Sequence, residues 1–211
     1  MHFNRGEVGP QGKDFSSMKR LGITVLLVGL AAPLALAQTQ GTVWTSDQAH
    51  SEVEFSIRHM SVSNVHGHFG KVAATILWNE AEPGKSTVTA TIDVSTIDTG
   101  VPGRDSDLKS DSFFDAAKFP TATFVSSGVV KDGGGFTVTG NLTLHGVTKP
   151  VVLSVEGPSG PVPGMDHKPH AGFTATTTIS RTAFGIGGKY PAAMVGDEVK
   201  LTIEVEAVKQ Q

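Results

Sequence analysis

The chain has 211 residues, no cysteine and a formal net charge of −3 at pH 7. The lack of cysteine excludes a disulfide framework and any thiolate chemistry. The acidic balance argues against a nucleic acid partner, because domains that bind nucleic acid carry a concentrated basic surface.

The N-terminal segment has the pattern of a secretory signal peptide. Met18-Lys19-Arg20 supplies a basic start to the apolar run LGITVLLVGLAAPLALA, which ends in Ala-Leu-Ala. We expect cleavage after Ala37 and a periplasmic or secreted protein; a transmembrane anchor is the less favoured interpretation, because the run is short and contains Pro33. Translation could begin at Met1 or at Met18. Cleavage would leave 13 basic and 18 acidic residues in segment 38–211, a net charge of −5 (13 minus 18).

Amphipathic strands follow along the rest of the chain. In segment 51–59 the residues Val53, Phe55 and Ile57 share one face, and the other face is polar, which predicts a half-buried strand. A polar linker is expected at 60–66. The strand candidates are 51–59, 68–78, 87–94, 121–130, 136–144, 150–156, 171–180 and 199–208.

Connections between these strands carry strong turn signals. Glu-Pro-Gly at 82–84 and Asp-Gly-Gly-Gly at 132–135 predict hairpins, and segment 157–170, rich in Gly and Pro, predicts an exposed loop. Segment 104–119 predicts one or two short helical turns over an opening. About eight one-sided strands with few helices favour a single all-β domain, either a sandwich or an up-and-down barrel.

Several histidines could carry chemistry. His66 and His68 would share a face of a strand, so a haem or metal site that uses them with His59 is one alternative. No third ligand follows at a recognised spacing, and we therefore assign no metal ligands. His59 has the same parity as Phe55 and Ile57. It is either a hydrogen-bonded histidine at the end of a buried face or a contact for a ligand headgroup.

Two arginines adjoin aromatic segments, Arg104 before Phe113-Phe114 and Arg181 before Phe184. A buried arginine needs a partner, and Asp105 or Asp107 could supply a carboxylate. An ion pair that ties a loop to the barrel is favoured over a contact with a ligand headgroup. The sequence has neither a G-x-S-x-G motif nor a phosphate-binding loop, which argues against an enzyme.

A set of motifs, in this order and spacing, resembles the YceI-like family of bacterial periplasmic lipid-binding proteins. The motifs are Asp47-x-x-His50-Ser51-x-Val53-x-Phe55-x-x-x-His59, Gly67-x-Phe69, Arg104-Asp105-x-x-Leu108, Phe113-Phe114-Asp115, Phe119-Pro120-x-x-x-Phe124, GNLTLHGVTKP at 140–150, Gly172-Phe173, Arg181-x-x-Phe184-Gly185 and Val195-Gly196-Asp197. The resemblance implies an eight-stranded antiparallel, lipocalin-like barrel over residues 38–211. It also implies a polyisoprenoid or similar amphiphile in the interior, and no other cofactor.

On this basis we expect an apolar wall for the lipid tail and polar contacts for its headgroup. The expected tail contacts are Phe55, Ile57, Phe69, Ile76, Phe113, Phe114, Phe124, Leu142, Leu144, Phe173, Ile179 and Phe184, and the expected headgroup contacts are His59, Arg104, Asp105 and Arg181. Phe69 can face inward only if a bulge separates it from Val72. Transient contact with a membrane or a lipid-handling protein is expected, and a dimer is possible. A filled barrel that acts as an interaction module is the other alternative.

Overall fold

The computed structural model describes residues 41–211. The expected signal peptide, its cleavage position and both candidate start sites lie outside the described residues. Between residues 41 and 211, no helix is long and apolar enough to cross a membrane.

Ten strands and a few short helices make up the described part of the chain. The strands are β1 (Thr42–Ser46), β2 (Glu52–His59), β3 (Ser63–Phe69), β4 (Val72–Trp78), β5 (Thr87–Asp93), β6 (Thr121–Asp132), β7 (Gly135–Leu144), β8 (Val147–Pro163), β9 (Pro169–Ser180) and β10 (Val195–Lys209). The helices are η1 (Pro83–Lys85), η2 (Val94–Thr96), α1 (Pro102–Lys109) and η3 (Thr182–Phe184). Val, Ile, Thr and Phe recur along the strands, as expected for a half-buried sheet.

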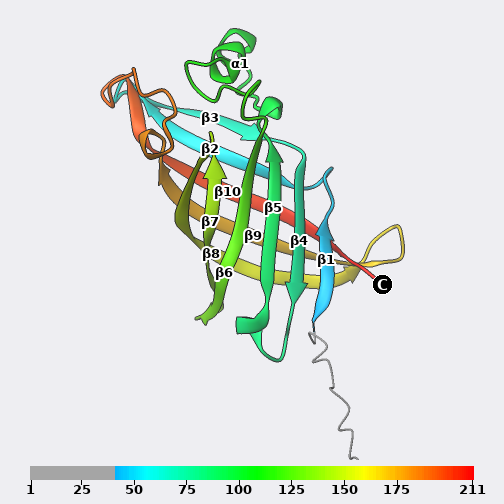
Figure 1. Ribbon diagram of the computed structural model, residues 1–211. Coiled ribbons are helices and arrows are strands. Elements are labelled where there is room, and N and C mark those ends of the chain that lie inside the picture. Colours follow the sequence, from blue (N-terminus) through cyan, green and yellow to red (C-terminus); the bar gives the residue numbers. More distant parts are fainter. Residues whose placement is uncertain (1–40) are drawn as a thin grey trace, which may run out of the picture. The chain divides into compact units, whose positions relative to one another are not determined.

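The strands close into an eight-stranded antiparallel barrel, as predicted (Figure 1). Its order is β1-β4-β5-β6-β7-β8-β9-β10, and β10 returns to pair with β1 through Trp44 and Lys209. The β2–β3 hairpin extends two strand positions of the barrel. β2 pairs with β10 beyond the end of β1, and β3 leads into β4. Because the sheet is closed, the side chains that point inward from alternate positions of every strand share one enclosed space.

The break between β3 and β4 explains how Phe69 faces inward. Gly70 and Lys71 separate the two strands, and Lys71 has a positive φ of 54°. Two residues therefore intervene where regular alternation allows one, and Phe69 and Val72 are both buried. A two-residue break between strands, rather than a bulge within one strand, thus lets Phe69 and Val72 face the same side.

Two local predictions were wrong. Segment 60–66 is not simply a linker, because a tight turn at Met60 and Ser61 leads directly into β3. Segment 157–170 is exposed, as predicted, but most of it is strand and not loop, because β8 runs to Pro163 and β9 begins at Pro169. Beyond Val155, β8 pairs with β9 alone. An edge of this kind tolerates proline, which cannot donate to a second neighbour.

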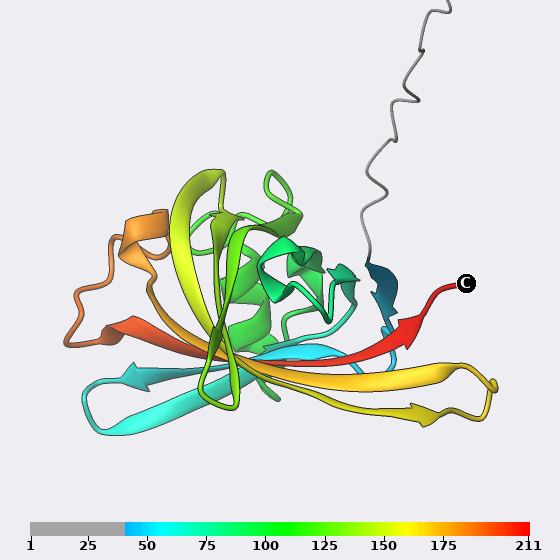
Figure 2. The ribbon, with the colours of Figure 1, turned by 90° about the horizontal axis from the view of Figure 1, so that it is seen from below.

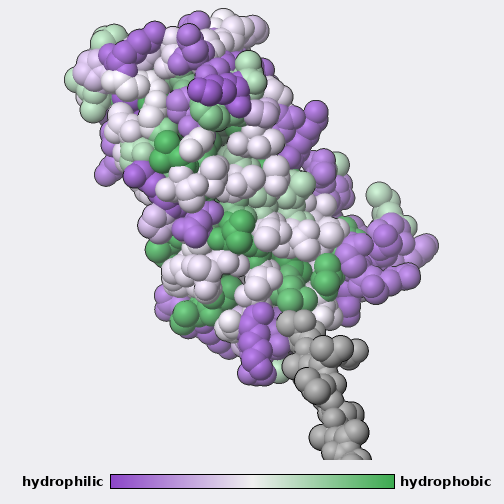
Figure 3. Space-filling model, in the orientation of Figure 1, coloured by the Kyte–Doolittle hydropathy of each residue, from purple (hydrophilic) through white to green (hydrophobic). Residues whose placement is uncertain are grey.

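The two ends of the barrel differ. The connection that contains α1 lies beyond the ends of β5 and β6, whereas the β4–β5 and β6–β7 turns lie at the opposite end (Figure 1). Seen from below, the β2–β3 and β8–β9 hairpins project in opposite directions (Figure 2). On the face in Figure 3 the outer surface is mostly pale or purple, with scattered apolar residues. The apolar side chains are thus concentrated in the interior, where two buried clusters form the core.

Candidate ligand-binding cavity

The barrel encloses two adjacent cavities. The larger, of about 340 Å³, reaches the α1 end, and the smaller, of about 150 Å³, lies deeper. Four side chains line both of them: Val53, Ile92, Leu142 and Leu201. The two cavities therefore lie next to each other inside the barrel and share part of their apolar wall.

Strand register brings the wall of the larger cavity together. Antiparallel pairing of β2 with β10 sets Phe55 opposite Leu201 and Ile57 opposite Val199. Residues that are directly paired across two strands point to the same side of a sheet. Ile179 of β9 pairs with Val199 and extends the same wall. The alternation in three distant segments of the sequence thus converges on one surface.

Aromatic side chains cover the mouth of the larger cavity. Phe114 meets Phe69 edge to face, with ring centroids 5.6 Å apart, and Phe69 contacts Phe55 at 5.7 Å. Phe113 stacks on Tyr190, with 4.9 Å between the centroids. The connection after α1 and the loop before β10 therefore meet over the opening.

The polar groups of the larger cavity gather at this mouth. Arg58, His59, Arg104 and Asp107 line it, together with Arg181. Arg104 donates from Nε to Thr99 Oγ1 (2.8 Å) and from Nη2 to Thr99 O (2.9 Å). The amide and hydroxyl of Thr99 in turn donate to Asp105 Oδ1. Asp105 therefore holds the start of α1 and does not line the cavity.

Arg181 is almost fully committed to the backbone. Its side chain is only 3% exposed, and all five of its N–H groups donate to carbonyl oxygens. The acceptors are Gly196 (2.8 Å), Ile186 (2.9 Å), Gly187 (2.7 Å), Tyr190 (2.7 Å) and Val195 (2.7 Å). The predicted carboxylate partner is thus wrong, because backbone carbonyls satisfy this guanidinium. Arg181 holds the loop before β10 in place above the cavity.

Aromatic rings also close the smaller cavity. Trp78 lies 5.1 Å from Phe136 and 6.4 Å from Phe173 between ring centroids. Ser86 and Thr177 are the polar members of its wall, and no charged residue lines it. A hydrocarbon chain can occupy such a space without desolvating any ionised group.

A family comparison decides what kind of barrel this is. The YceI-like domain model matches residues 44–207. The chain belongs to the YceI-like family. Protein YceI of Salmonella newport is 39% identical over 166 residues, which cover 77% of this chain and 83% of that protein. A UPF0312 protein of Pectobacterium atrosepticum is 34% identical over 196 residues, 92% of this chain and 100% of the relative.

Solved structures agree with this assignment. BcnA of Burkholderia cenocepacia superposes with a TM-score of 0.69 at 28% identity, over 76% of this chain and 98% of BcnA. The YceI protein of Campylobacter jejuni gives 0.65 at 33% identity, over 74% and 91%. A polyisoprenoid-binding domain of Saccharophagus degradans gives 0.58 over 81% and 99%. At 16% identity, this last likeness shows the fold alone.

The YceI-like barrel places most of the expected tail contacts on its inner wall. Those on the larger cavity are Phe55, Ile57, Phe69, Phe113, Phe114, Leu142, Leu144 and Ile179; those on the smaller are Ile76, Phe124 and Phe173, and Leu142 lines both. Phe184 lines neither cavity. It is buried in the core, and its carbonyl accepts a hydrogen bond of 3.1 Å from His145 Nδ1.

Sequence reasoning missed several lining residues. Val199, Leu201 and Trp78 continue alternating patterns that were visible in the sequence. Arg58 has outward parity, yet it lines the mouth, because β10 is irregular between Val195 and Val199 where it meets the end of β2. Gly196 is the one signal of this irregularity in the sequence, because an isolated glycine within a strand is typical of a bulge.

The histidines of β2 and β3 do not form a ligand set. The backbone N–H and carbonyl of His68 pair with Asp98, and the side chain of His66 is exposed. Among residues 41–211, the group of three metal-capable side chains that converge is Asp47, His50 and Glu206. Within residues 41–211, His59, His66 and His68 are thus not brought together as a set of three metal ligands.

Proposed function

We propose that this YceI-like protein is a non-catalytic, periplasmic or secreted binding protein that holds the tail of a long-chain amphiphile inside its barrel. The observation that carries the proposal is the pair of adjacent apolar cavities that share four wall residues, with charged groups only at the mouth of the larger one. The larger cavity alone falls within the usual range for small-molecule sites, about 300–1,000 Å³. The signal-peptide pattern and the polyisoprenoid-binding fold neighbour also support it.

The cavities set a scale for the ligand. Their volumes of about 340 and 150 Å³ together make about 490 Å³. A dry cavity of about 150 Å³ holds benzene, or roughly 25 Å³ per carbon. About 20 carbons therefore fit, which matches a fatty acyl chain or a short isoprenoid tail. A longer polyisoprenoid or quinone tail requires the barrel to expand or the chain to protrude from the mouth.

Burial of such a tail accounts for tight binding. At about 0.8 kcal/mol for each buried CH₂, 20 carbons contribute a gross ~16 kcal/mol. The loss of chain freedom and imperfect packing reduce this figure, and observed affinities reach at most about 20 kcal/mol. The headgroup then mainly sets orientation and selectivity. Of the expected headgroup contacts, we assign His59 and Arg104 to this role, since both line the mouth.

Uptake from a membrane would use the exposed apolar rim beside the mouth. Met60, Val62 and Met194 are exposed, and the Met60 amide donates to the Met194 carbonyl (2.8 Å). Neighbouring Arg58 supplies a cation that an anionic lipid surface attracts. We expect Met60→Ser with Val62→Ser to slow lipid transfer from anionic vesicles several-fold. The exposed barrel residue Val152→Ser is the matched control.

The first test is the lipid content of the purified full chain. Organic extraction and mass spectrometry should recover about one amphiphile per chain, with a tail of about 20 carbons or more. Absence of a stoichiometric lipid, together with no uptake of added fatty acid or isoprenoid quinone, would refute the proposal.

A pair of variants on β6 tests the location of the tail. Ala122 lines the larger cavity, and Ala122→Phe adds six carbons to that space. This should shorten the preferred tail by about six carbons, or cost up to ~5 kcal/mol in affinity at 0.8 kcal/mol per carbon. Val125 is 53% exposed on the outer face of the same strand, and Val125→Phe should change nothing. Equal binding by both variants would place the ligand outside the barrel.

A further inference from the structure

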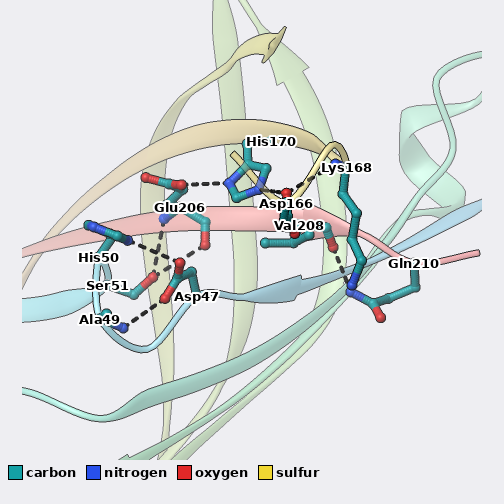
Figure 4. Close-up of polar contacts among 10 residues, drawn as sticks. All are labelled: Asp47, Ala49, His50, Ser51, Asp166, Lys168, His170, Glu206, Val208 and Gln210. Carbon is teal, nitrogen blue, oxygen red and sulfur yellow. Dashed lines mark hydrogen bonds and ion pairs between the residues drawn. The ribbon is translucent and has the colours of Figure 1, made fainter. Parts of the chain in front are cut away.

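A second cluster of functional side chains lies outside both barrel cavities. The connection between β1 and β2 folds against β10, where Asp47 and His50 approach Glu206 (Figure 4). One potential ligand atom from each of these residues lies within 4.8 Å of the other two. The cluster joins residues from the two ends of the described chain, because Glu206 lies 159 positions after Asp47 (206 minus 47).

Backbone contacts fix the two segments against each other. The Asp47 amide donates to the Glu206 carbonyl (2.7 Å), and the Glu206 amide donates to Ser51 Oγ (3.1 Å). Ser51 itself is buried. The Ala49 amide donates to Asp47 Oδ1 (2.9 Å), which holds that carboxylate over the turn. An incoming ligand would therefore need to move side chains only, at little entropic cost.

A further imidazole orients the glutamate. His170 Nδ1 lies 2.6 Å from Glu206 Oε1, and His170 Nε2 lies 3.0 Å from Asp166 Oδ1 (Figure 4). This chain links the cluster to the β8–β9 hairpin. Partners of this kind, behind the ligand atoms, are common in metal sites and fix the direction of a ligating carboxylate.

We propose that Asp47, His50 and Glu206 bind a divalent transition metal ion, with Zn²⁺ as the best fit. One imidazole nitrogen and two carboxylate oxygens form a donor set that Zn²⁺ accepts, whereas Ca²⁺ and Mg²⁺ prefer oxygen donors alone. With bonds of about 2.1 Å, ligand atoms around a tetrahedral Zn²⁺ lie roughly 3.4 Å apart. The three atoms here, at most 4.8 Å apart, need to close by no more than about 1.4 Å.

The site is open enough to load. The side chains of Asp47, His50 and Glu206 are 29%, 63% and 38% exposed. A water molecule can take the fourth position. A bound ion would tie the β1–β2 connection to β10 and, through His170, to the β8–β9 hairpin. We therefore infer a structural clamp that is independent of the lipid cavity, since none of these side chains lines it.

Titration of the purified full chain without an affinity tag tests the site. Isothermal calorimetry with Zn²⁺ should give one ion per chain, and Zn²⁺ should raise the melting temperature. His50→Ala, Asp47→Asn and Glu206→Gln should each weaken binding at least tenfold. His170→Ala should weaken it about tenfold, as expected for a positioning residue. Ca²⁺ at equal concentration should leave Zn²⁺ binding unchanged.

His66→Ala is the matched control, because His66 is also exposed and lies outside the cluster. Its Zn²⁺ affinity should equal that of the unmodified chain. The metal-free His50→Ala protein should melt normally, since this side chain is mostly exposed, which separates loss of binding from misfolding. Three results would overturn the proposal: no saturable Zn²⁺ binding, unchanged binding in all cluster variants, or an equal loss in His66→Ala.

Discussion

The five hydrogen bonds of Arg181 lead to a quantitative prediction for Arg181→Lys. A lysine ammonium has three N–H donors, whereas the guanidinium uses five. At least two of the five carbonyls therefore lose their partner, and the Ile186 and Gly187 acceptors lie where the bonds are fully buried. Each buried unsatisfied acceptor costs about 1–3 kcal/mol, so the expected loss is about 2–6 kcal/mol. That is a large part of the ~5–15 kcal/mol available to a typical domain.

Urea unfolding followed by tryptophan fluorescence measures this loss. With a slope of about 2 kcal/mol per molar urea, the midpoint should fall by roughly 1–3 M. Arg104→Lys is the matched control, because Arg104 makes only two bonds, both to Thr99, and a lysine can replace them. Stability of Arg181→Lys within 0.5 kcal/mol of the unmodified protein would refute the argument. A tenfold loss of lipid affinity in folded Arg181→Lys would instead return Arg181 to the headgroup.

Two further predictions concern the loop before β10 and the inner wall. Hydrogen bonds from the side chains of Thr182 and then Ser180 lower the pKa of Asp197 below its usual 3.8. The ionised carboxylate therefore stabilises the fold fully above pH 3.8, and this contribution is lost as the pH falls through the folded-state pKa. The stability advantage over Asp197→Asn, measured by urea unfolding at several pH values, should shrink below pH 3.8; a constant difference would contradict the assignment. A Cβ at Gly67 would lie 2.5 Å from the Phe55 ring and push it into the larger cavity, so Gly67→Ala should cost about 1–3 kcal/mol and weaken lipid binding. Gly70→Ala, where nothing lies within 4 Å, should be close to neutral, and similar effects for both would contradict a packing origin.

The barrel could be predicted because alternation survives in most strands. Phe55 and Ile57 on β2 and Leu201 on β10 repeat the same two-residue period, and closure of the sheet brings them onto one wall. β3 escaped detection because Gly67 occupies one of its inward positions. The ring of Phe55, directly opposite, fills the space that a side chain would take. β3 therefore lacks the alternating apolar side chains by which a half-buried strand is recognised in a sequence.

The candidate sites were harder to predict because their partners are set by register and by backbone atoms. Backbone carbonyls have no signature in a sequence. The sequence therefore indicated a carboxylate partner for Arg181, whereas five backbone carbonyls accept its hydrogen bonds. The sequence pattern favoured His66 and His68 as ligands, whereas His50 is the histidine that lies near two carboxylates. Only the pairing of β1 and β2 with β10 brings Glu206 to it.

The unequal strength of the contacts at the mouth indicates which part opens for a ligand. The connection after α1 meets the loop before β10 through the Phe113–Tyr190 stack and a bond of 2.6 Å from Lys189 Nζ to Ser112 Oγ. Segment 110–119 also makes the aromatic pairs Phe114–Phe69 and Phe119–His145, so its contacts cost roughly 4 kcal/mol to break, about 1 for each of the three aromatic pairs and about 1 for the hydrogen bond. The loop before β10 is held by all five bonds of Arg181, which cost far more.

We therefore expect segment 110–119 to swing aside while segment 185–196 stays in place. Amide hydrogen exchange of the lipid-free chain should then be faster in 110–119 than in 185–196, because local opening follows the weaker contacts. Added lipid should slow exchange in 110–119 alone, since Phe113 and Phe114 would close over the tail. Faster exchange in 185–196 would reverse the assignment and would make the loop anchored by Arg181 the moving part.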